Sequence, residues 1–267
     1  MPTLVIVPTY NERENLPQLA AELLGLAADL HLLVVDDHSP DGTGELADAL
    51  ARQDPRVAVL HRPGKQGLGS AYVAGFQFAL AAGFDRVVEM DADFSHRPAD
   101  LPRLLAAAGA ADVVVGSRNV PGGKAVGWSP LRHAISKGGS WYARQLLGLP
   151  IRDCTSGFKV FNRRALEELN LDALRSSGYA FQVEVNNACH MAGLTFAEVP
   201  ITFPDRQRGR SKMSSGIVLE AMLLALRLRL GWCQPAIRAA ARGQAELGRT
   251  ESANQLPLDS VALDVAR

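Results

Sequence analysis

Short β-branched runs alternate with amphipathic segments through the first half of this chain, and that pattern leaves few folds open. It predicts an α/β domain with a mostly parallel sheet covered by helices on both faces. In open sheets of this kind, ligands bind beyond the carboxyl ends of the strands. The predicted strands are Thr3 to Pro8, His31 to Asp36, Val57 to His61, Arg86 to Asp91 and Asp112 to Ser117.

Polar groups follow four of these predicted strands. Because the carboxyl ends of parallel strands meet at one edge of a sheet, these groups predict a single shared site. The segments are Pro8-Thr9-Tyr10-Asn11-Glu12, Asp36-Asp37-His38-Ser39, Asp91-Ala92-Asp93 and Gly116-Ser117-Arg118.

Asp91 and Asp93 are the strongest candidates for chemistry. They lie two residues apart at the end of an apolar run, so a bend there can bring both carboxylates to one hard cation. A metal held by two carboxylates keeps coordination positions for the oxygens of a substrate diphosphate. The alternative is a pair of solvated turn residues, since Asp is common where strands end.

Seven spaced motifs occur in unbroken order over roughly residues 3 to 215: VPTYNERENL, VVDDHSPDGT, LGSAY, MDADFSH, GSR, SGFKVF and FPDRQRGRSK. Together they closely resemble the dolichyl-phosphate or polyprenyl-phosphate mannose synthases of the inverting glycosyltransferase family 2. The resemblance implies a single Rossmann-like, nucleotide-sugar-binding domain of the A-type fold. It also implies metal-dependent transfer of mannose from GDP-mannose to a polyprenyl monophosphate, giving polyprenyl β-mannosyl phosphate and GDP.

The resemblance assigns the nucleotide end of the site residue by residue. Tyr10 can offer a ring face, and Glu12 can accept hydrogen bonds from an amino-bearing purine such as guanine. Asp36 is expected to be structural, whereas its neighbour Asp37 contacts the ligand. A local alternative is that Asn11 or Asn15 caps the following helix. The nucleotide positions are Pro8, Tyr10, Glu12, Val35 and Asp37.

The family's metal carboxylates fall on Asp91 and Asp93, with Ala92 near the diphosphate. Either Mg²⁺ or Mn²⁺ suits such oxygen ligands. Some members place Gln where Ser95 stands here. Because Ser is a shorter and poorer ligand, we expect a water to complete the shell.

The phosphate-binding cations assigned by the resemblance are Arg118, Arg206 and Lys212, while Arg118, Arg132 and Ser136 match acceptor-phosphate positions. The alternatives are a solvated basic loop over residues 207 to 211 and a surface Arg-Ser pair on a helix. The acceptor phosphate is already largely ionised near neutral pH, its second pKa being ~6, so no strong general base is needed. Asp93, Arg118 and Arg132 are the expected catalytic residues.

The predicted organisation is a catalytic domain over residues 1–215, a basic amphipathic region over 216–242 and a disordered tail over 243–267. Residues 206–242 hold eight Arg or Lys and one acid, Glu220, among aliphatic side chains. This pattern favours an anionic membrane surface over nucleic acid. Residues 217–232 are too short and too charged to span a bilayer, which takes about 20 apolar residues, so they lie in the interface or pack on the domain.

The expected location is the cytoplasmic face of a membrane. A strand begins almost at the N-terminus, which leaves no room for a signal peptide, and three isolated cysteines fit a reducing compartment. Some relatives carry transmembrane spans or use a separate anchoring protein, so a membrane partner is a further expectation.

Three other functions compete. A nicotinamide oxidoreductase would need a third glycine where Tyr72 follows Gly67 and Gly69. A silent nucleotide-sugar or lipid-binding module would not need the Asp91-Asp93 pair. A polyprenyl-phosphate glucosyltransferase that uses UDP-glucose is the nearest alternative.

Overall fold

The computed structural model describes residues 1–205, 215–232 and 236–237. All five predicted strands are present, with ends shifted by at most two residues. Four further strands were not predicted, and three of them are only three to five residues long and partly exposed. The strands are β1 (Thr3–Thr9), β2 (Leu30–Asp36), β3 (Val57–His61), β4 (Arg86–Glu89), β5 (Val113–Ser117), β6 (Lys124–Val126), β7 (Lys159–Asn162), β8 (Phe196–Pro200) and β9 (Thr202–Pro204).

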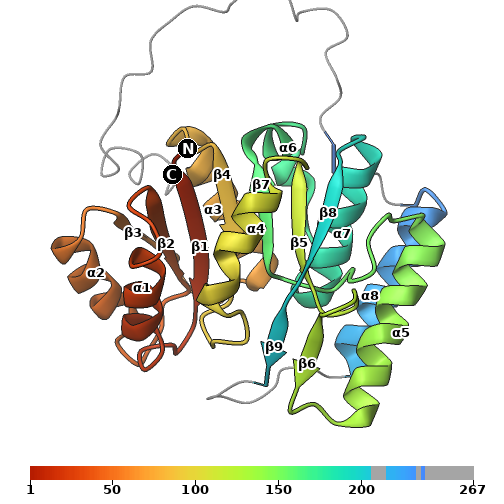
Figure 1. The fold of residues 1–267 in the computed structure, drawn as a ribbon, viewed down its shortest axis with the longest axis horizontal. Helices are drawn as coiled ribbons and strands as arrows, with labels where there is room; N and C mark the ends of the chain where they lie inside the picture. Colours follow the sequence, from red (N-terminus) through yellow and green to blue (C-terminus); the bar gives the residue numbers. More distant parts are fainter. Residues whose placement is uncertain (206–214, 233–235, 238–267) are drawn as a thin grey trace, which may run out of the picture.

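Seven strands form one sheet in the order β3-β2-β1-β4-β7-β5-β8 (Figure 1). All neighbours pair in parallel except β7, which runs antiparallel between β4 and β5. The sheet is therefore mostly parallel, as predicted. In the cross-strand register, Glu89 of β4 lies opposite Lys159 of β7.

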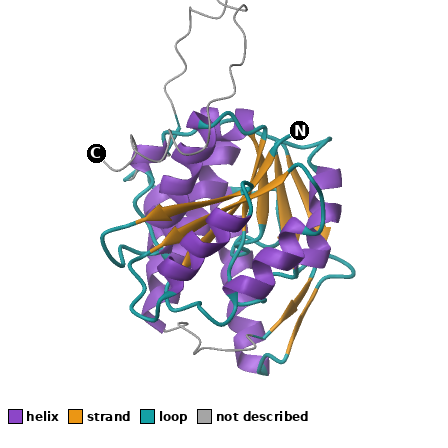
Figure 2. Ribbon diagram, turned by 90° about the vertical axis from the view of Figure 1, so that its left-hand side faces the viewer, coloured by secondary structure: helices purple, strands orange, loops and turns teal. Residues whose placement is uncertain are grey.

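Helices cover both faces of this sheet (Figure 2). Successive residues of β1 point into opposite core layers, Leu4 and Ile6 into one and Val5 and Val7 into the other, which explains the continuous apolar run. The helices are α1 (Leu16–Leu24), α2 (Thr43–Gln53), α3 (Leu68–Ala81), α4 (Leu101–Ala107), α5 (Pro130–Leu147), α6 (Arg163–Glu167), α7 (Gly178–Met191) and α8 (Ser215–Arg229), with 3-10 turns at Pro98–Asp100 and Leu171–Ala173.

The two faces carry different helices. Helices α1, α2 and α4 pack on one face, and α3, α6 and α7 pack on the other. Helix α3 approaches β1 closely at Gly75, where a Cβ atom would lie 2.6 Å from Ile6 Cγ2. A separate parallel ribbon of β6 and β9 lies at the carboxyl edge of the main sheet (Figure 1).

Helix α8 packs against α5 and α7, at the edge of the domain (Figure 1). Ala225 is buried there, whereas Leu223, Leu226, Leu230 and Trp232 are exposed. The interpretation that this segment packs on the domain is therefore confirmed, whereas its place in a membrane interface stays a prediction. No described helix is long and apolar enough to cross a membrane. The predicted tail at 243–267 lies outside the described residues.

Candidate active site

The carboxyl ends of β1, β2, β4 and β5 open into one cleft, where the sequence placed a shared site. Of the other predicted residues, Val35 is buried in the core, Ser95 is buried beside the cleft and Ser136 lines an adjoining cavity. Arg206 and Lys212 lie outside the described residues. The cleft-lining predicted residues are Pro8, Tyr10, Glu12, Asp37, Asp91, Ala92, Asp93, Arg118 and Arg132.

Tyr10 and Glu12 stand at the end of β1. The Lys65 Nζ atom lies 4.3 Å from the centre of the Tyr10 ring, and Lys65 also lines the cleft. Glu12 Oε2 accepts a hydrogen bond from Asn15 Nδ2 at 2.8 Å. Asn15 does occupy the N-cap position of α1, but its side chain makes no capping hydrogen bond. Its amide orients Glu12 instead.

The two neighbouring aspartates after β2 have different roles. Asp36 accepts hydrogen bonds from the Thr9 hydroxyl at 2.9 Å and from the Ser39 hydroxyl at 2.6 Å, which confirms it as a structural residue. Asp37 lines the cleft and pairs with Arg62, with 3.0 Å between Oδ1 and Nη1. Burial raises the pKa of Asp37, although the Arg62 charge opposes this rise. Asp37 is thus held in place by a cation that the sequence did not reveal.

The Asp91-Asp93 pair lies in a tight turn after β4. Asp91 Oδ1 accepts from the Tyr72 hydroxyl at 3.3 Å, and the Asp91 amide donates to His96 Nδ1 at 2.9 Å. Asp93 Oδ1 accepts from the Ser95 amide at 3.0 Å. Phe94, between them, has a φ of 59°, a conformation that is costly for a bulky residue. Such strain is typical of turns whose shape serves a site.

A divalent cation fits this turn. The structure supplies two carboxylates, and the buried Ser95 hydroxyl has no hydrogen-bond partner among the described residues. Within the same part of the chain, no group of three or more His, Cys, Asp or Glu is arranged to hold a metal. A cation here would therefore keep open positions, which suits Mg²⁺ or Mn²⁺ bound together with a diphosphate.

Arg118, at the end of β5, is held by a buried carboxylate. Its Nε and Nη2 atoms donate to the two oxygens of Asp153 at 2.8 and 2.7 Å, and Nη2 also donates to the Thr155 hydroxyl at 2.9 Å. Burial alone would raise the pKa of Asp153, but the Arg118 charge and its hydrogen bonds outweigh burial, and the pKa is lowered. Arg118 therefore reaches the cleft as one member of a fixed ion pair.

Arg132 enters the cleft from the first turn of α5. Its guanidinium lies 4.2 Å from the centre of the Trp128 ring, and Nη1 lies 2.8 Å from Asp205 Oδ1. Ser129 caps this helix and accepts from the Arg132 amide at 3.3 Å. The planar guanidinium is therefore stacked and oriented, as a phosphate-binding fork requires.

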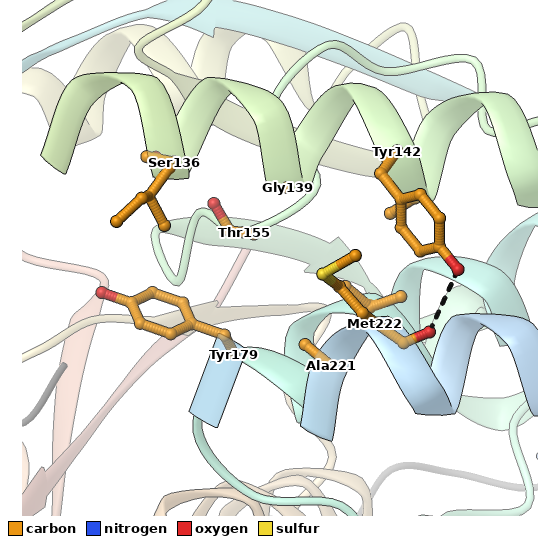
Figure 3. Close-up of a pocket in the computed structure, with 10 residues that line it drawn as sticks. Ser136, Gly139, Tyr142, Thr155, Tyr179, Ala221 and Met222 are labelled. Carbon is orange, nitrogen blue, oxygen red and sulfur yellow. Dashed lines mark hydrogen bonds between the residues drawn. The ribbon is translucent and has the colours of Figure 1, made fainter. Parts of the chain in front are cut away.

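An apolar cavity adjoins the cleft between α5, α7 and α8 (Figure 3). Thr155 and Tyr179 line both the cavity and the cleft, so the two spaces meet at these residues. In Figure 3, Ser136, Gly139 and Tyr142 lie on one side of the cavity, opposite Tyr179 and Met222. The Tyr142 hydroxyl donates to the Met222 carbonyl at 3.4 Å and joins α5 to α8.

Sequence reasoning missed several cleft residues: Lys65, His96, Thr155, Gly157, Tyr179 and Gln182. His96 and Gly157 belong to the motifs MDADFSH and SGFKVF, so those motifs could have indicated them. Gln182 and Tyr179 come from α7, which follows no predicted strand, and their sequence gives no comparable signal.

A mostly parallel sheet with helices on both faces and a carboxylate pair at its carboxyl edge are the features of a glycosyltransferase of the A-type fold. Three comparisons with known proteins agree. The model of the family "Glycosyl transferase family 2" matches residues 4–170. The chain also resembles glucosyl-3-phosphoglycerate synthase from Mycobacterium tuberculosis, solved with Mn²⁺, UDP and its product. The TM-score is 0.62 at 21% identity, over 86% of this chain and 80% of that one.

Two curated relatives are much closer in sequence. An undecaprenyl-phosphate mannosyltransferase of Micrococcus luteus is 49% identical over 239 residues, 90% of this chain and 98% of that protein. A polyprenol monophosphomannose synthase of Mycolicibacterium smegmatis is 50% identical over 222 residues, 82% of this chain and 84% of that protein. The chain belongs to glycosyltransferase family 2, in the group of polyprenyl-phosphate mannose synthases.

Proposed function

We propose that this protein transfers mannose from GDP-mannose to the phosphate of a polyprenyl monophosphate, with inversion at the anomeric carbon. The observation that carries the proposal is the junction at Thr155 and Tyr179, where a polar cleft meets an apolar cavity. A polar donor and an apolar acceptor need this combination of spaces. The names of the two curated relatives support both the sugar and the lipid.

The donor would lie along the cleft. Tyr10 and Glu12 would contact the guanine ring, and Asp37, fixed by Arg62, would contact the ribose. Asp91 and Asp93 would hold Mg²⁺ or Mn²⁺, which supplies charge that stabilises the departing diphosphate. Arg206 and Lys212 remain proposed ligands of the phosphates.

The acceptor would approach from the apolar cavity, its chain between α5 and α8 and its phosphate at the junction. Arg132 and Arg118 would orient the phosphate, and Ser136 would donate a hydrogen bond to it. Because the phosphate is already ionised near neutral pH, these residues need only align an oxygen with the anomeric carbon and shield two anions from each other. Inversion follows if that oxygen attacks opposite to the departing diphosphate.

The outward face of α5 and α8 supports a place at a membrane surface. Trp141 of α5, Leu226, Arg227 and Arg229 of α8, and Trp232 just after α8 are all exposed. Aromatic and aliphatic side chains beside Arg are typical of a helix that lies in the interface of an anionic bilayer. We place the protein on the cytoplasmic face, where a membrane-anchoring protein could bind it.

The test is transfer of labelled sugar from GDP-mannose, and in parallel from UDP-glucose, into a polyprenyl phosphate in detergent. We expect lipid labelling from GDP-mannose with Mg²⁺ or Mn²⁺ and none with EDTA. Labelling from UDP-glucose alone would overturn the assignment of the nucleotide pocket. No labelling from either donor would favour a silent binding module.

A further inference from the structure

A buried charged pair lies directly below the cleft. Lys159 of β7 and Glu89 of β4 are opposite each other in the sheet, both are 0% exposed, and 3.8 Å separates Nζ from Glu89 Oε2. Burying two charges is costly, and a pair at this distance recovers only part of that cost. An apolar pair would satisfy the core equally well. The pair therefore suggests a role beyond packing.

Lys159 also orients a neutral amide. Its Nζ donates to Oε1 of Gln182 on α7, which is 2% exposed. An ammonium group can only donate, so the atom that it contacts must be the amide oxygen. The orientation of the Gln182 side chain is thereby fixed, with the Nε2 donor on the opposite side of the amide. Burial raises the pKa of Glu89 to about 7, although the Lys159 charge and the Gln182 amide oppose this rise.

The Gln182 Nε2 atom lies beside the cleft, next to Gly157. It is buried and has no hydrogen-bond partner among the described residues, and Gln182 lines the same cleft as Asp91 and Asp93. Gly157 also lines the cleft, and a Cβ atom there would lie 3.5 Å from Nε2, in van der Waals contact with the donor. An unpaired buried donor is costly, and a ligand that accepts its hydrogen bond would recover that cost.

We propose that Gln182 is a specificity residue that donates a hydrogen bond from Nε2 to a hydroxyl oxygen of the donor sugar. This inference rests on the proposed function. A sugar hydroxyl suits Gln182 because the amide is an uncharged donor, whereas Arg118 and a cation at Asp91 and Asp93 would serve the diphosphate. Lys159 is the positioning residue that holds the amide in the donating orientation.

The test compares the binding of GDP with that of GDP-mannose to the full chain, with Mn²⁺, by isothermal titration calorimetry. Because GDP lacks the sugar, Gln182→Ala should leave its Kd unchanged and should raise the Kd of GDP-mannose about three- to tenfold. GDP-mannose has four single deoxy analogues, and one of them should bind the wild-type protein more weakly by the same factor. The Kd of that analogue should not rise further in Gln182→Ala, because the hydroxyl that Gln182 contacts is already missing. Equal losses for GDP and GDP-mannose, or no loss, would overturn the proposal.

A second variant covers the case in which Gln182→Ala does not fold. Gly157→Ala removes no hydrogen bond and places a methyl group in van der Waals contact with Nε2, so the same selective loss is expected. Gln77→Ala, whose amide contacts Asp172 on the surface, is the control and should change neither Kd. If the wild-type protein binds UDP-glucose in place of GDP-mannose, the proposed function fails. The role of Gln182 is then tested by comparing the Kd of UDP with that of UDP-glucose in the wild type and in Gln182→Ala, and a loss for UDP-glucose alone supports it.

Discussion

Arg118 and Asp153 form a buried, two-pronged ion pair that fixes a cation at the rim of the cleft. Asp153 is 0% exposed and also accepts from the Arg118 backbone amide at 2.9 Å. The guanidinium lies 5.1 Å from the centre of the Phe203 ring and 5.3 Å from that of Trp128. Its orientation is therefore set before any substrate arrives, which lowers the entropy lost on binding.

Asp153→Asn should lower the free energy of unfolding by about 3–5 kcal/mol, because it leaves the Arg118 charge buried without a counter-ion. Urea unfolding of both proteins at pH 7 measures the difference. A loss below about 1 kcal/mol would show that Arg118 finds another partner.

The same pair predicts a pH dependence. The pKa of Asp153 is lowered below its ordinary 3.8, so its contribution is complete above that pH and is lost as pH falls through the folded-state pKa. The difference in stability between the wild type and Asp153→Asn should therefore narrow below about pH 3.8. A difference that stays constant down to pH 2.5 would contradict this assignment.

Asp93→Asn should reduce transfer about 100-fold or more, because the variant loses a charged metal ligand. Asparagine keeps the acceptor for the Ser95 amide, so the melting temperature should change little; a steady-state assay and a thermal scan check both effects. Asp172→Asn, at an exposed carboxylate, is the matched control. Normal turnover in Asp93→Asn would remove the metal assignment.

Arg132→Ala should raise the KM for polyprenyl phosphate about tenfold and change the KM for the donor by less than about twofold, since Arg132 is proposed to bind the acceptor phosphate. Initial rates with each substrate varied in turn give both constants. Arg144→Ala, later on the same helix, should alter neither. Equal effects on both constants would count against the acceptor role.

Gly139→Leu should block the apolar cavity and reduce transfer to long-chain polyprenyl phosphate several-fold, with a smaller effect on a short-chain acceptor. Gly138→Leu is a close control, because the neighbouring glycine is exposed and does not line the cavity, while both changes favour the helix equally. If the two variants behave alike, the cavity does not hold the lipid chain.

Replacing Trp141 and Trp232 together by Ser should abolish binding to phosphatidylglycerol vesicles. These rings are 64% and 73% exposed, and α8 carries the exposed cations Arg227 and Arg229. Cosedimentation measures the bound fraction, with phosphatidylcholine vesicles as the uncharged comparison. Met191→Ser, at an exposed site at the end of α7, should bind like the wild type.

The sequence predicted the parallel half of the fold because β-branched runs buried on both faces give a strong local signal. It did not predict β7, whose buried Lys159 depends on Glu89 of β4 and Gln182 of α7, both distant in the sequence. The short strands β6 and β9 are partly exposed and carry little apolar pattern.

The site residues also divide into those with a local sequence signal and those that depend on distant partners. Asp91 and Asp93 could be predicted because two acids end an apolar run. Arg62 and Asp153 could not, since their roles depend on Asp37 and Arg118, which lie 25 and 35 residues away in the sequence. A carboxylate that follows a strand is expected to face solvent, but Asp93 is only 6% exposed. A local sequence pattern does not show which distant residues form ion pairs in the folded protein.

The antiparallel strand β7 has a consequence for how this chain acquires its fold during synthesis. Strands β1 to β4 can pair as they leave the ribosome, but the open edge of β4 must wait until residue 162 has been made, and β5 has no partner in the sheet until then. Such long-range pairing is slow and exposes unpaired edges. A nascent chain stalled near residue 150 should therefore depend strongly on chaperones, and synthesis through β7 and then β8 should lessen that dependence in steps.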